Sequence, residues 1–201
     1  MKTRLVIIFI MANLWILSAK AQEADWQRSY QLESYGKYSE AIAAIDVIEP
    51  KSHDGELKAI RRGWLFYLLT SYNESIREYR LAIERNNNSV DAHLGLLLPL
   101  LAQQRWREAE LGANNALKLA PNNYLALLRL AIAQEGQRNW EGMHKTATQL
   151  VSAYPTDTSA YVYLARANLW LNNKKAATIA YKAVLSRYPD HLEAKTYFVN
   201  K

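Results

Sequence analysis

Trp106-Arg107-Glu108-Ala109-Glu110 decides the fold, because its pattern returns at a fixed interval along the 201-residue chain. The stretch opens with an aromatic residue, continues with residues suited to a helix start, and places a small residue three positions after the ring. Copies begin at Tyr38, Tyr72 and Trp140, so that successive rings are equally spaced, and a copy from Lys174 keeps the small residue without the ring. A fixed period of this length predicts stacked structural repeats, each of which buries its apolar face against its neighbours.

Two further sets of residues keep the same register. The prolines Pro121, Pro155 and Pro189 are separated by the same interval as the rings, and each is expected to end a helix because its ring cannot continue the hydrogen-bond ladder. The position three after the aromatic residue holds Ala41, Ser75, Ala109, Met143 and Ala177. Small residues at such a position indicate two helices that cross closely. Met143 therefore predicts a compensating small residue, and Ala147 is the candidate.

These residues resemble the tetratricopeptide repeat, a helix–turn–helix unit with the same period of about 34 residues. The resemblance extends over residues 22–190. It implies an all-α fold, a right-handed α-solenoid of about five repeats with a capping helix over 191–200. The first helices are predicted at 24–35, 56–69, 90–103, 124–137 and 158–171. The second helices are predicted at 39–49, 73–85, 107–119, 141–153 and 175–187.

The first 21 residues have the pattern of a secretory signal peptide. Met1 to Arg4 is basic, Leu5 to Leu17 is an apolar run, and Ala19-Lys20-Ala21 is a cleavage site of the A-x-A type. We therefore expect residues 1–21 to be a signal peptide and residues 22–201 to be one repeat domain, exported to a bacterial periplasm. An uncleaved helix that anchors the chain in the inner membrane, facing the periplasm, remains the alternative.

The composition argues against nucleic acid as a partner. The net charge of +6 includes Lys2, Arg4 and Lys20, so the chain from residue 22 has 22 basic and 19 acidic residues, or +3. A small excess spread over a helical surface is typical of a solvated face rather than of a nucleic-acid footprint. The chain has no cysteine, which excludes a disulfide framework and a lipidated cysteine.

The sequence gives no sign of an enzyme, a cofactor or a metal site. The four histidines, His53, His93, His144 and His191, are widely separated, and none has a second histidine or a cysteine at metal-ligand spacing. There is no cysteine nucleophile, no G-x-S-x-G motif and no glycine loop that could hold a phosphate. We predict no catalytic, cofactor-binding or metal-binding residues.

The resemblance also implies where a partner binds, because the first helices of tetratricopeptide proteins line the concave face. Carried onto this sequence, that face holds aromatic, aliphatic and arginine side chains, the residue types that are frequent at binding hot spots. The candidate groove residues are Trp26, Tyr30, Arg61, Trp64, Tyr67, Leu94, Leu98, Arg129, Ile132, Tyr163, Arg166 and Trp170, together with Ile60 and Leu128. The lysine and asparagine set with which some family members hold a C-terminal carboxylate is not reproduced.

Two interpretations of these side chains stay open, because an apolar stripe at helical spacing also forms the core between repeats. We expect Arg61, Arg129 and Arg166 to face solvent or ligand, since unpaired charges are rarely buried. The expected ligand is an amphipathic helix or an extended apolar segment with some acidic character. The predicted function is a non-enzymatic periplasmic scaffold or adaptor, in a setting such as envelope or secretion-complex assembly; the alternative is a membrane-tethered structural subunit.

Overall fold

The computed structural model describes residues 23–48 and 54–199, and every regular element in these two ranges is a helix. This confirms the all-α prediction. The predicted signal peptide over 1–21 lies outside the described residues. So do Pro50 and the last predicted residue of the capping helix, Asn200.

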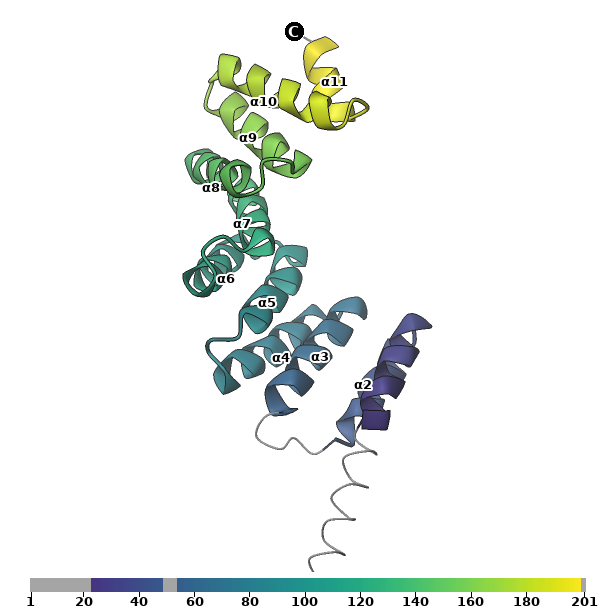
Figure 1. The fold of residues 1–201 in the computed structure, drawn as a ribbon. Helices are drawn as coiled ribbons and strands as arrows, with labels where there is room; N and C mark the ends of the chain where they lie inside the picture. Colours follow the sequence, from purple (N-terminus) through teal and green to yellow (C-terminus); the bar gives the residue numbers. More distant parts are fainter. Residues whose placement is uncertain (1–22, 49–53, 200–201) are drawn as a thin grey trace, which may run out of the picture. The chain divides into compact units, whose positions relative to one another are not determined.

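The chain divides into two compact units between Arg85 and Asn86, each of which is shown in Figure 1. The boundary falls at the Asn86-Asn87-Asn88 turn. That residues 22–201 form one repeat domain stays a prediction. The first unit contains a helix over 23–34, α2 (Tyr38–Asp46), α3 (Asp54–Leu68) and α4 (Tyr72–Arg85). The second contains α5 (Val90–Ala102), α6 (Trp106–Leu119), α7 (Tyr124–Gly136), α8 (Trp140–Ala153), α9 (Thr158–Trp170), α10 (Lys174–Arg187) and α11 (Leu192–Val199).

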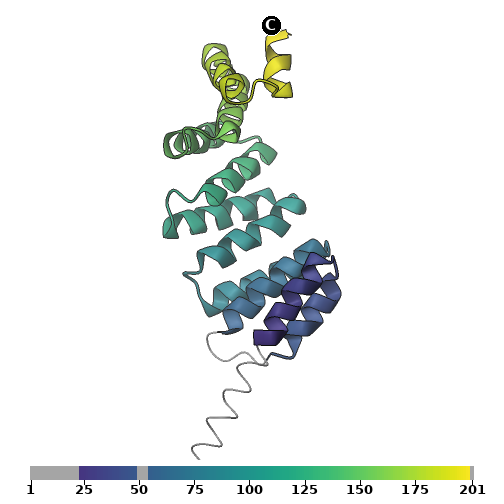
Figure 2. The same ribbon diagram turned by 45° about the vertical axis from the view of Figure 1, so that its right-hand side comes forward.

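Within each unit, a helix packs mainly against the next helix along the chain. In the first unit α3 packs against both α2 and α4, and in the second every helix from α5 to α10 contacts its successor. The helices α5 and α7 also contact each other directly, and Figure 2 shows the successive pairs from a second direction. The first and last residues of the helices lie within three residues of the predicted ones. The predicted helix–turn–helix repeats are therefore confirmed.

The periodic prolines lie directly after the second helices, as predicted. Pro121, Pro155 and Pro189 each follow a helix end by two residues. The intervening residues, Ala120, Tyr154 and Tyr188, have φ between −138 and −133° and ψ between 68 and 89°. A residue before proline is pushed out of the α region by the ring, so the sequence ends each helix here by local sterics.

The turn inside each repeat contains a residue in the left-handed conformation. Positive φ values between 57 and 72° occur at Gly36, Thr70, Gln104, Arg138 and Asn172, which recur at the same interval as the aromatic rings. This conformation ends a helix by bending the chain back, and glycine is the residue that adopts it without a steric penalty. The position therefore repeats although its residue type does not, which is why the sequence pattern did not reveal it.

The first helices of the second unit share a helix start. The side chains of Ser89, Asn123 and Asp157 accept hydrogen bonds from the backbone N–H groups of Ala92, Ala126 and Ala160, at 3.2, 3.0 and 2.7 Å. At the next position in this register, His191 Nδ1 accepts from Ala194 N at 3.4 Å. Each cap satisfies a donor that the helix leaves without an internal partner, which fixes where the helix begins.

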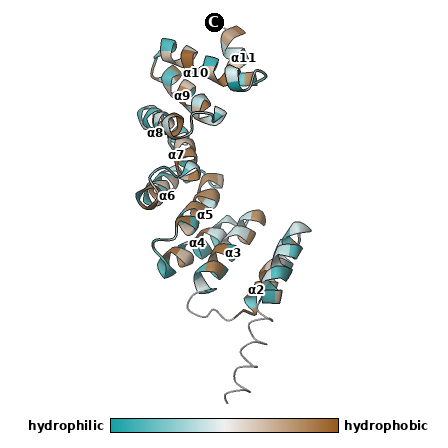
Figure 3. Ribbon diagram, in the orientation of Figure 1, coloured by the Kyte–Doolittle hydropathy of each residue, from teal (hydrophilic) through white to brown (hydrophobic). Residues whose placement is uncertain are grey.

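The core of each repeat lies where the pattern predicts close crossings. The side chains of Ala41, Ser75, Ala109, Met143 and Ala177 are all at most 1 % exposed. Met143 packs in a cluster with the small residues Ala131 and Ala167, and Ala147, the predicted compensating residue, is fully buried as well. The helix α5 is apolar around most of its circumference, as the hydropathy colours in Figure 3 show, and carries a buried Pro99.

Candidate functional site

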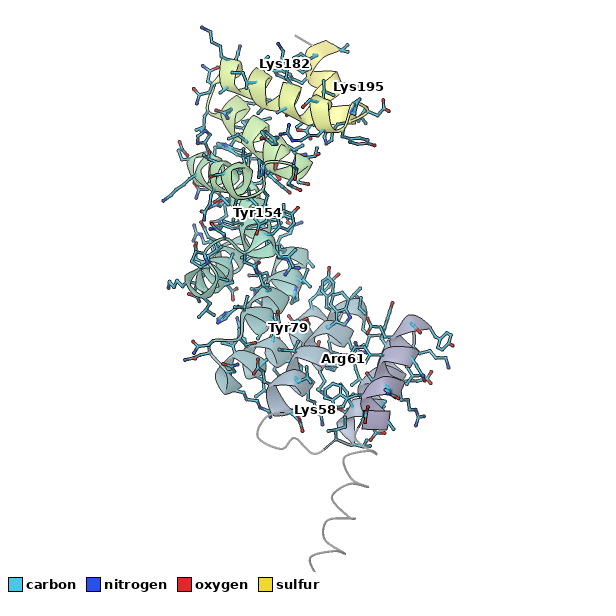
Figure 4. All side chains as sticks on the ribbon, viewed as in Figure 1. Lys58, Arg61, Tyr79, Tyr154, Lys182 and Lys195 are labelled. Atoms are coloured by element: carbon cyan, nitrogen blue, oxygen red, sulfur yellow. The ribbon has the colours of Figure 1, made fainter. Side chains whose placement is uncertain are left out.

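In the first unit, Arg61 is a buried ion-pair partner rather than a free cation. Its guanidinium bonds the Glu33 carboxylate, donates to the Ser29 hydroxyl at 3.1 and 3.2 Å and lies 4.0 Å from the centre of the Tyr30 ring. Only 5 % of Arg61 is exposed. Figure 4 labels this residue on α3. The expectation that Arg61 faces solvent is wrong, because Glu33 supplies the countercharge that permits burial.

Two aromatic candidates of the first unit, Tyr30 and Trp64, contact this ion pair. Trp64 Nε1 donates to Glu33 at 2.7 Å, and the Trp64 ring stacks on Tyr67 with centroids 5.7 Å apart. Trp26 instead packs against the core cluster of α2 and α3. Tyr30 keeps 53 % of its surface exposed. Tyr30 therefore offers the most accessible aromatic surface among these residues, and Trp26 belongs to the core.

In the second unit, Arg166 holds two carboxylates from neighbouring helices. It bonds Glu135 of α7 at 3.1 Å and Glu193 of α11 at 2.9 and 2.5 Å. Tyr181 of α10 also donates to Glu193, at 2.7 Å. The network joins four helices and leaves the site without a net positive charge from Arg166.

The protonation of this network follows from its hydrogen bonds. Burial disfavours the charged form of Glu193, but hydrogen bonds from Arg166 and Tyr181 outweigh it and hold the pKa of Glu193 below its usual value. Burial and the neighbouring Glu193 raise the pKa of Tyr181, and the hydrogen bond to Glu193 raises the pKa of Arg166. At neutral pH, Glu193 and Arg166 are therefore charged and the Tyr181 hydroxyl keeps its proton.

The other first-helix candidates of the second unit divide between core and surface. Leu94 is 8 % exposed and belongs to the core cluster of α5, α6 and α7, so it is not a groove residue. Arg129 donates to the Leu94 carbonyl oxygen at 2.7 Å, which ties α7 to α5. Leu98 and Ile132 are half-buried and stay available to a partner.

A depression of about 310 Å³ lies beside Arg166, between the start of α9 and the turn that joins α10 to α11. Its lining residues combine hydroxyl, imidazole, guanidinium and apolar groups: Thr158, Ser159, Val162, Tyr163, Arg166, Tyr188 and His191. Burial and the Glu135 charge raise the pKa of Tyr163, so its hydroxyl stays protonated. Tyr188 is 53 % exposed and meets the His191 ring edge to face at 6.0 Å.

Trp170, the last candidate, lies apart from this depression at the opposite end of α9. Its ring stacks on Trp140 of α8, with centroids 4.9 Å apart and an interplanar angle of 5°, and 65 % of Trp170 remains exposed. It is an accessible aromatic surface outside the lining of the depression.

The arginines therefore do not form an acid-binding surface. Arg61 and Arg166 pair with carboxylates of this chain, and Arg129 bonds a backbone carbonyl. The residues that the sequence analysis missed are the partners Glu33, Glu135 and Glu193. Glu33 and Glu135 occupy the same position of the repeat, three periods apart. This recurrence in the sequence could have identified these two carboxylates as arginine partners.

Residues 23–48 and 54–199 show neither a metal-binding cluster nor a membrane-spanning helix. These ranges contain no group of three or more histidine, cysteine, aspartate or glutamate side chains arranged to hold a metal ion. Within the same ranges, none of the helices has both the length and the apolar surface that crossing a bilayer requires.

The comparisons with known proteins agree with this architecture. The tetratricopeptide repeat family model matches residues 125–157 and 159–191, while no curated protein matches the sequence significantly. A solved structure described as MamA 41-end from Desulfovibrio magneticus RS-1 is 15 % identical with a TM-score of 0.76, covering 86 % of this chain and 97 % of its own.

A second similar structure is YrrB, described as a TPR protein with an unusual peptide-binding site. It is 15 % identical with a TM-score of 0.73, and the alignment covers 90 % of this chain and 96 % of YrrB. At this identity the likeness concerns the fold alone. The chain has the fold of a tetratricopeptide α-solenoid, and its residues 125–157 and 159–191 match the tetratricopeptide repeat.

Proposed function

We propose that this protein is a non-enzymatic adaptor that binds a peptide segment of a partner protein, with the depression beside Arg166 as the principal contact. The observation that carries the proposal is the combination of groups in that depression. Tyr163, Val162 and Tyr188 provide apolar walls, and Thr158, Ser159 and His191 provide hydrogen-bonding groups between them. A concave apolar site with a few placed polar groups is the usual form of a recognition pocket.

The ligand that suits this depression is neutral and extended rather than acidic. Arg166, the one arginine or lysine in the lining, already bonds Glu135 and Glu193, so a third carboxylate would meet two negative charges. Hydroxyl and imidazole groups suit the amides of a peptide backbone, and Tyr188 suits an apolar side chain. We assign the depression a segment of apolar and uncharged polar residues.

The test uses a peptide selected from a displayed random dodecapeptide library against the full mature chain. We expect a dissociation constant of about 1 μM, equivalent to about −8 kcal/mol. Ser159→Arg places a long cation in the depression and is expected to weaken binding about tenfold or more. The matched control is Ser152→Arg, an exposed position on α8. Selected peptides that bind both variants as they bind the original chain would place the site elsewhere.

We further propose that the protein works in the periplasm, where it supports envelope or secretion-complex assembly. The support is the signal-peptide pattern of residues 1–21. Intact-mass measurement of the protein from the producing cell tests this: a chain that begins at Gln22 supports export with cleavage. A chain that keeps residues 1–21 and sediments with membranes supports the tethered structural subunit instead.

A further inference from the structure

The helix α10 differs in charge from the other second helices. Glu40, Glu74, Glu108 and Glu141 lie in the first turns of α2, α4, α6 and α8, where the helix dipole favours a negative charge. In α10 the first turn has no acidic residue and begins with Lys174 and Lys175. The dipole disfavours cations at this end, so these lysines oppose the local preference instead of following it.

The charge extends over the whole α9–α10 hairpin. Residues 158–189 contain no aspartate or glutamate, and their basic residues are Arg166, Lys174, Lys175, Lys182 and Arg187. Arg166 is neutralised by Glu135 and Glu193. Arg187 donates to the Pro155 carbonyl at 2.7 Å and lies 4.1 Å from the centre of the Tyr161 ring. Both arginines therefore already interact with groups of this chain.

The three lysines of α10 differ from these arginines, because their charged groups make no such bonds within the described residues. Lys174, Lys175 and Lys182 are exposed, and within residues 23–48 and 54–199 their ammonium groups have no hydrogen bond or ion pair. Figure 4 labels Lys182 on α10. By contrast, Lys195 of α11 pairs with Asp190 at 2.5 Å. The surface of α10 therefore carries three cations that are free to meet an external anion.

An exposed apolar residue stands between these charges. Ile179 is 70 % exposed and follows Lys175 by four residues and precedes Lys182 by three, so all three share one face of α10. Ala176 and Ala183 flank Ile179 on the same face, where small side chains permit the close approach of another helix. Lys175 and Lys182 lie about 10 Å apart along the axis, at about 1.5 Å per residue.

We propose that this face of α10 docks an acidic amphipathic helix of a partner protein. A helix lying along α10 would bring carboxylates seven residues apart to Lys175 and Lys182, with an apolar residue between them against Ile179. Lys174 strengthens the field at the start of α10, and a carboxylate there offsets the repulsion between the lysines and the helix dipole. The surface is distinct from the depression beside Arg166, which takes the neutral segment.

A membrane surface fits this face less well than a protein does. A helix that lies in a bilayer interface needs a broad face of large apolar side chains. On α10, which the structure describes in full, Ile179 is the one large apolar side chain among the exposed ones. One isoleucine between lysines suits a helix-to-helix contact with ionic flanks.

The test measures binding of a fluorescein-labelled, alanine-based helical peptide of four turns that carries two glutamates seven residues apart and a leucine between them. In the chain from residue 22, the variant K174Q/K175Q/K182Q is expected to bind the peptide at least about tenfold more weakly than the unsubstituted chain. The affinity of the unsubstituted chain should fall as the salt concentration rises. The matched control K118Q/K145Q removes two exposed lysines of α6 and α8 and should change affinity less than about twofold. Ile179→Ser should weaken binding without altering the salt dependence.

The opposing outcomes are equally specific. Equal affinity of the original chain and the triple variant would overturn the proposal, and so would equal binding of a peptide with glutamine in place of glutamate. Co-sedimentation with phosphatidylglycerol vesicles that needs the three lysines, with no lysine-dependent peptide binding, would replace the partner helix by an anionic membrane. Ser159→Arg should leave the affinity for this probe unchanged, so that failure here and failure of the peptide-binding depression are separate results.

Discussion

The Trp106 ring lies directly on the backbone of Gly136, at the end of the first helix of the following repeat. A Cβ atom at position 136 would stand 2.5 Å from two atoms of the ring, much closer than van der Waals contact. One repeat later the same pair of positions holds Trp140 and Trp170, whose rings stack at 4.9 Å. The periodic ring thus meets a bare backbone in one repeat and a second ring in the next.

The contact predicts a coupled effect of substitutions at positions 106 and 136. Gly136→Ala should lower the free energy of unfolding by about 1–3 kcal/mol, because the added methyl group displaces the ring. In a Trp106→Ala background the same change should have little effect, since the obstruction is gone. Urea unfolding of the four proteins measures the coupling. Equal effects of Gly136→Ala in both backgrounds would show that the ring does not rest on this backbone.

The left-handed turn position predicts a stabilising substitution. Thr70 has φ of 59° although it is β-branched, a conformation that costs a non-glycine residue about 1–2 kcal/mol. Thr70→Gly should therefore raise the free energy of unfolding by about 0.5–1 kcal/mol, after the entropy lost by glycine. Chemical denaturation followed by circular dichroism measures the change. Thr156→Gly, an exposed threonine in the turn after α8 whose φ is not in the left-handed region, is the control and should not stabilise.

The Glu193 network predicts how stability depends on pH. The pKa of Glu193 is lower in the folded protein than its usual value of 4.5, so its ionised form stabilises the fold. This contribution is fully present above the unfolded pKa and is lost as the pH falls through the folded pKa. Between about pH 5 and pH 3, the original chain should lose more stability than Glu193→Gln does. Urea unfolding at several pH values measures this difference. If the free energy of unfolding of both proteins fell equally over this pH range, the Glu193 network would not stabilise the fold.

The buried ion pair in the first unit predicts different outcomes for single and double substitutions. Arg61→Ala should destabilise by about 3–5 kcal/mol, because it leaves the Ser29 hydroxyl without its partner and the Glu33 carboxylate without a countercharge, although Trp64 still donates to Glu33. Arg61→Leu combined with Glu33→Leu should cost clearly less, since neither charge is then left alone. Thermal unfolding of the two variants distinguishes them. A double variant as unstable as Arg61→Ala would mean that packing, not charge pairing, sets the role of Arg61.

The sequence predicted the helices well because their ends are encoded locally. Pro121, Pro155 and Pro189 end the second helices by steric exclusion that acts on adjacent residues, and the recurring rings set the register. The described ends therefore lie within three residues of the predicted ones. Steric effects of a residue on its immediate neighbours can be predicted from the sequence without knowledge of the fold.

The candidate groove was harder to predict because burial depends on residues far along the chain. Arg61 is buried on account of Glu33, 28 residues earlier, and Arg166 is neutralised by Glu135 and Glu193, 31 residues before and 27 after it. Helical periodicity identifies the face on which an arginine lies, but not which carboxylate the next repeat brings to it. The turn position at Thr70, Gln104 and Arg138 was missed for a different reason, because the shared feature is a backbone angle.

The capping residues Ser89, Asn123, Asp157 and His191 have a consequence for how such a protein can be altered. Each helical hairpin from residue 89 onward, and α11 after them, begins with its own capping residue at the same position of the repeat. Removing or inserting a segment of exactly one period therefore keeps a capping residue at the start of every remaining helix pair. Deletion or duplication of one complete hairpin should therefore leave the remaining ones correctly phased, whereas an excision of any other length would misalign everything downstream. The array can therefore change in length only by whole repeats.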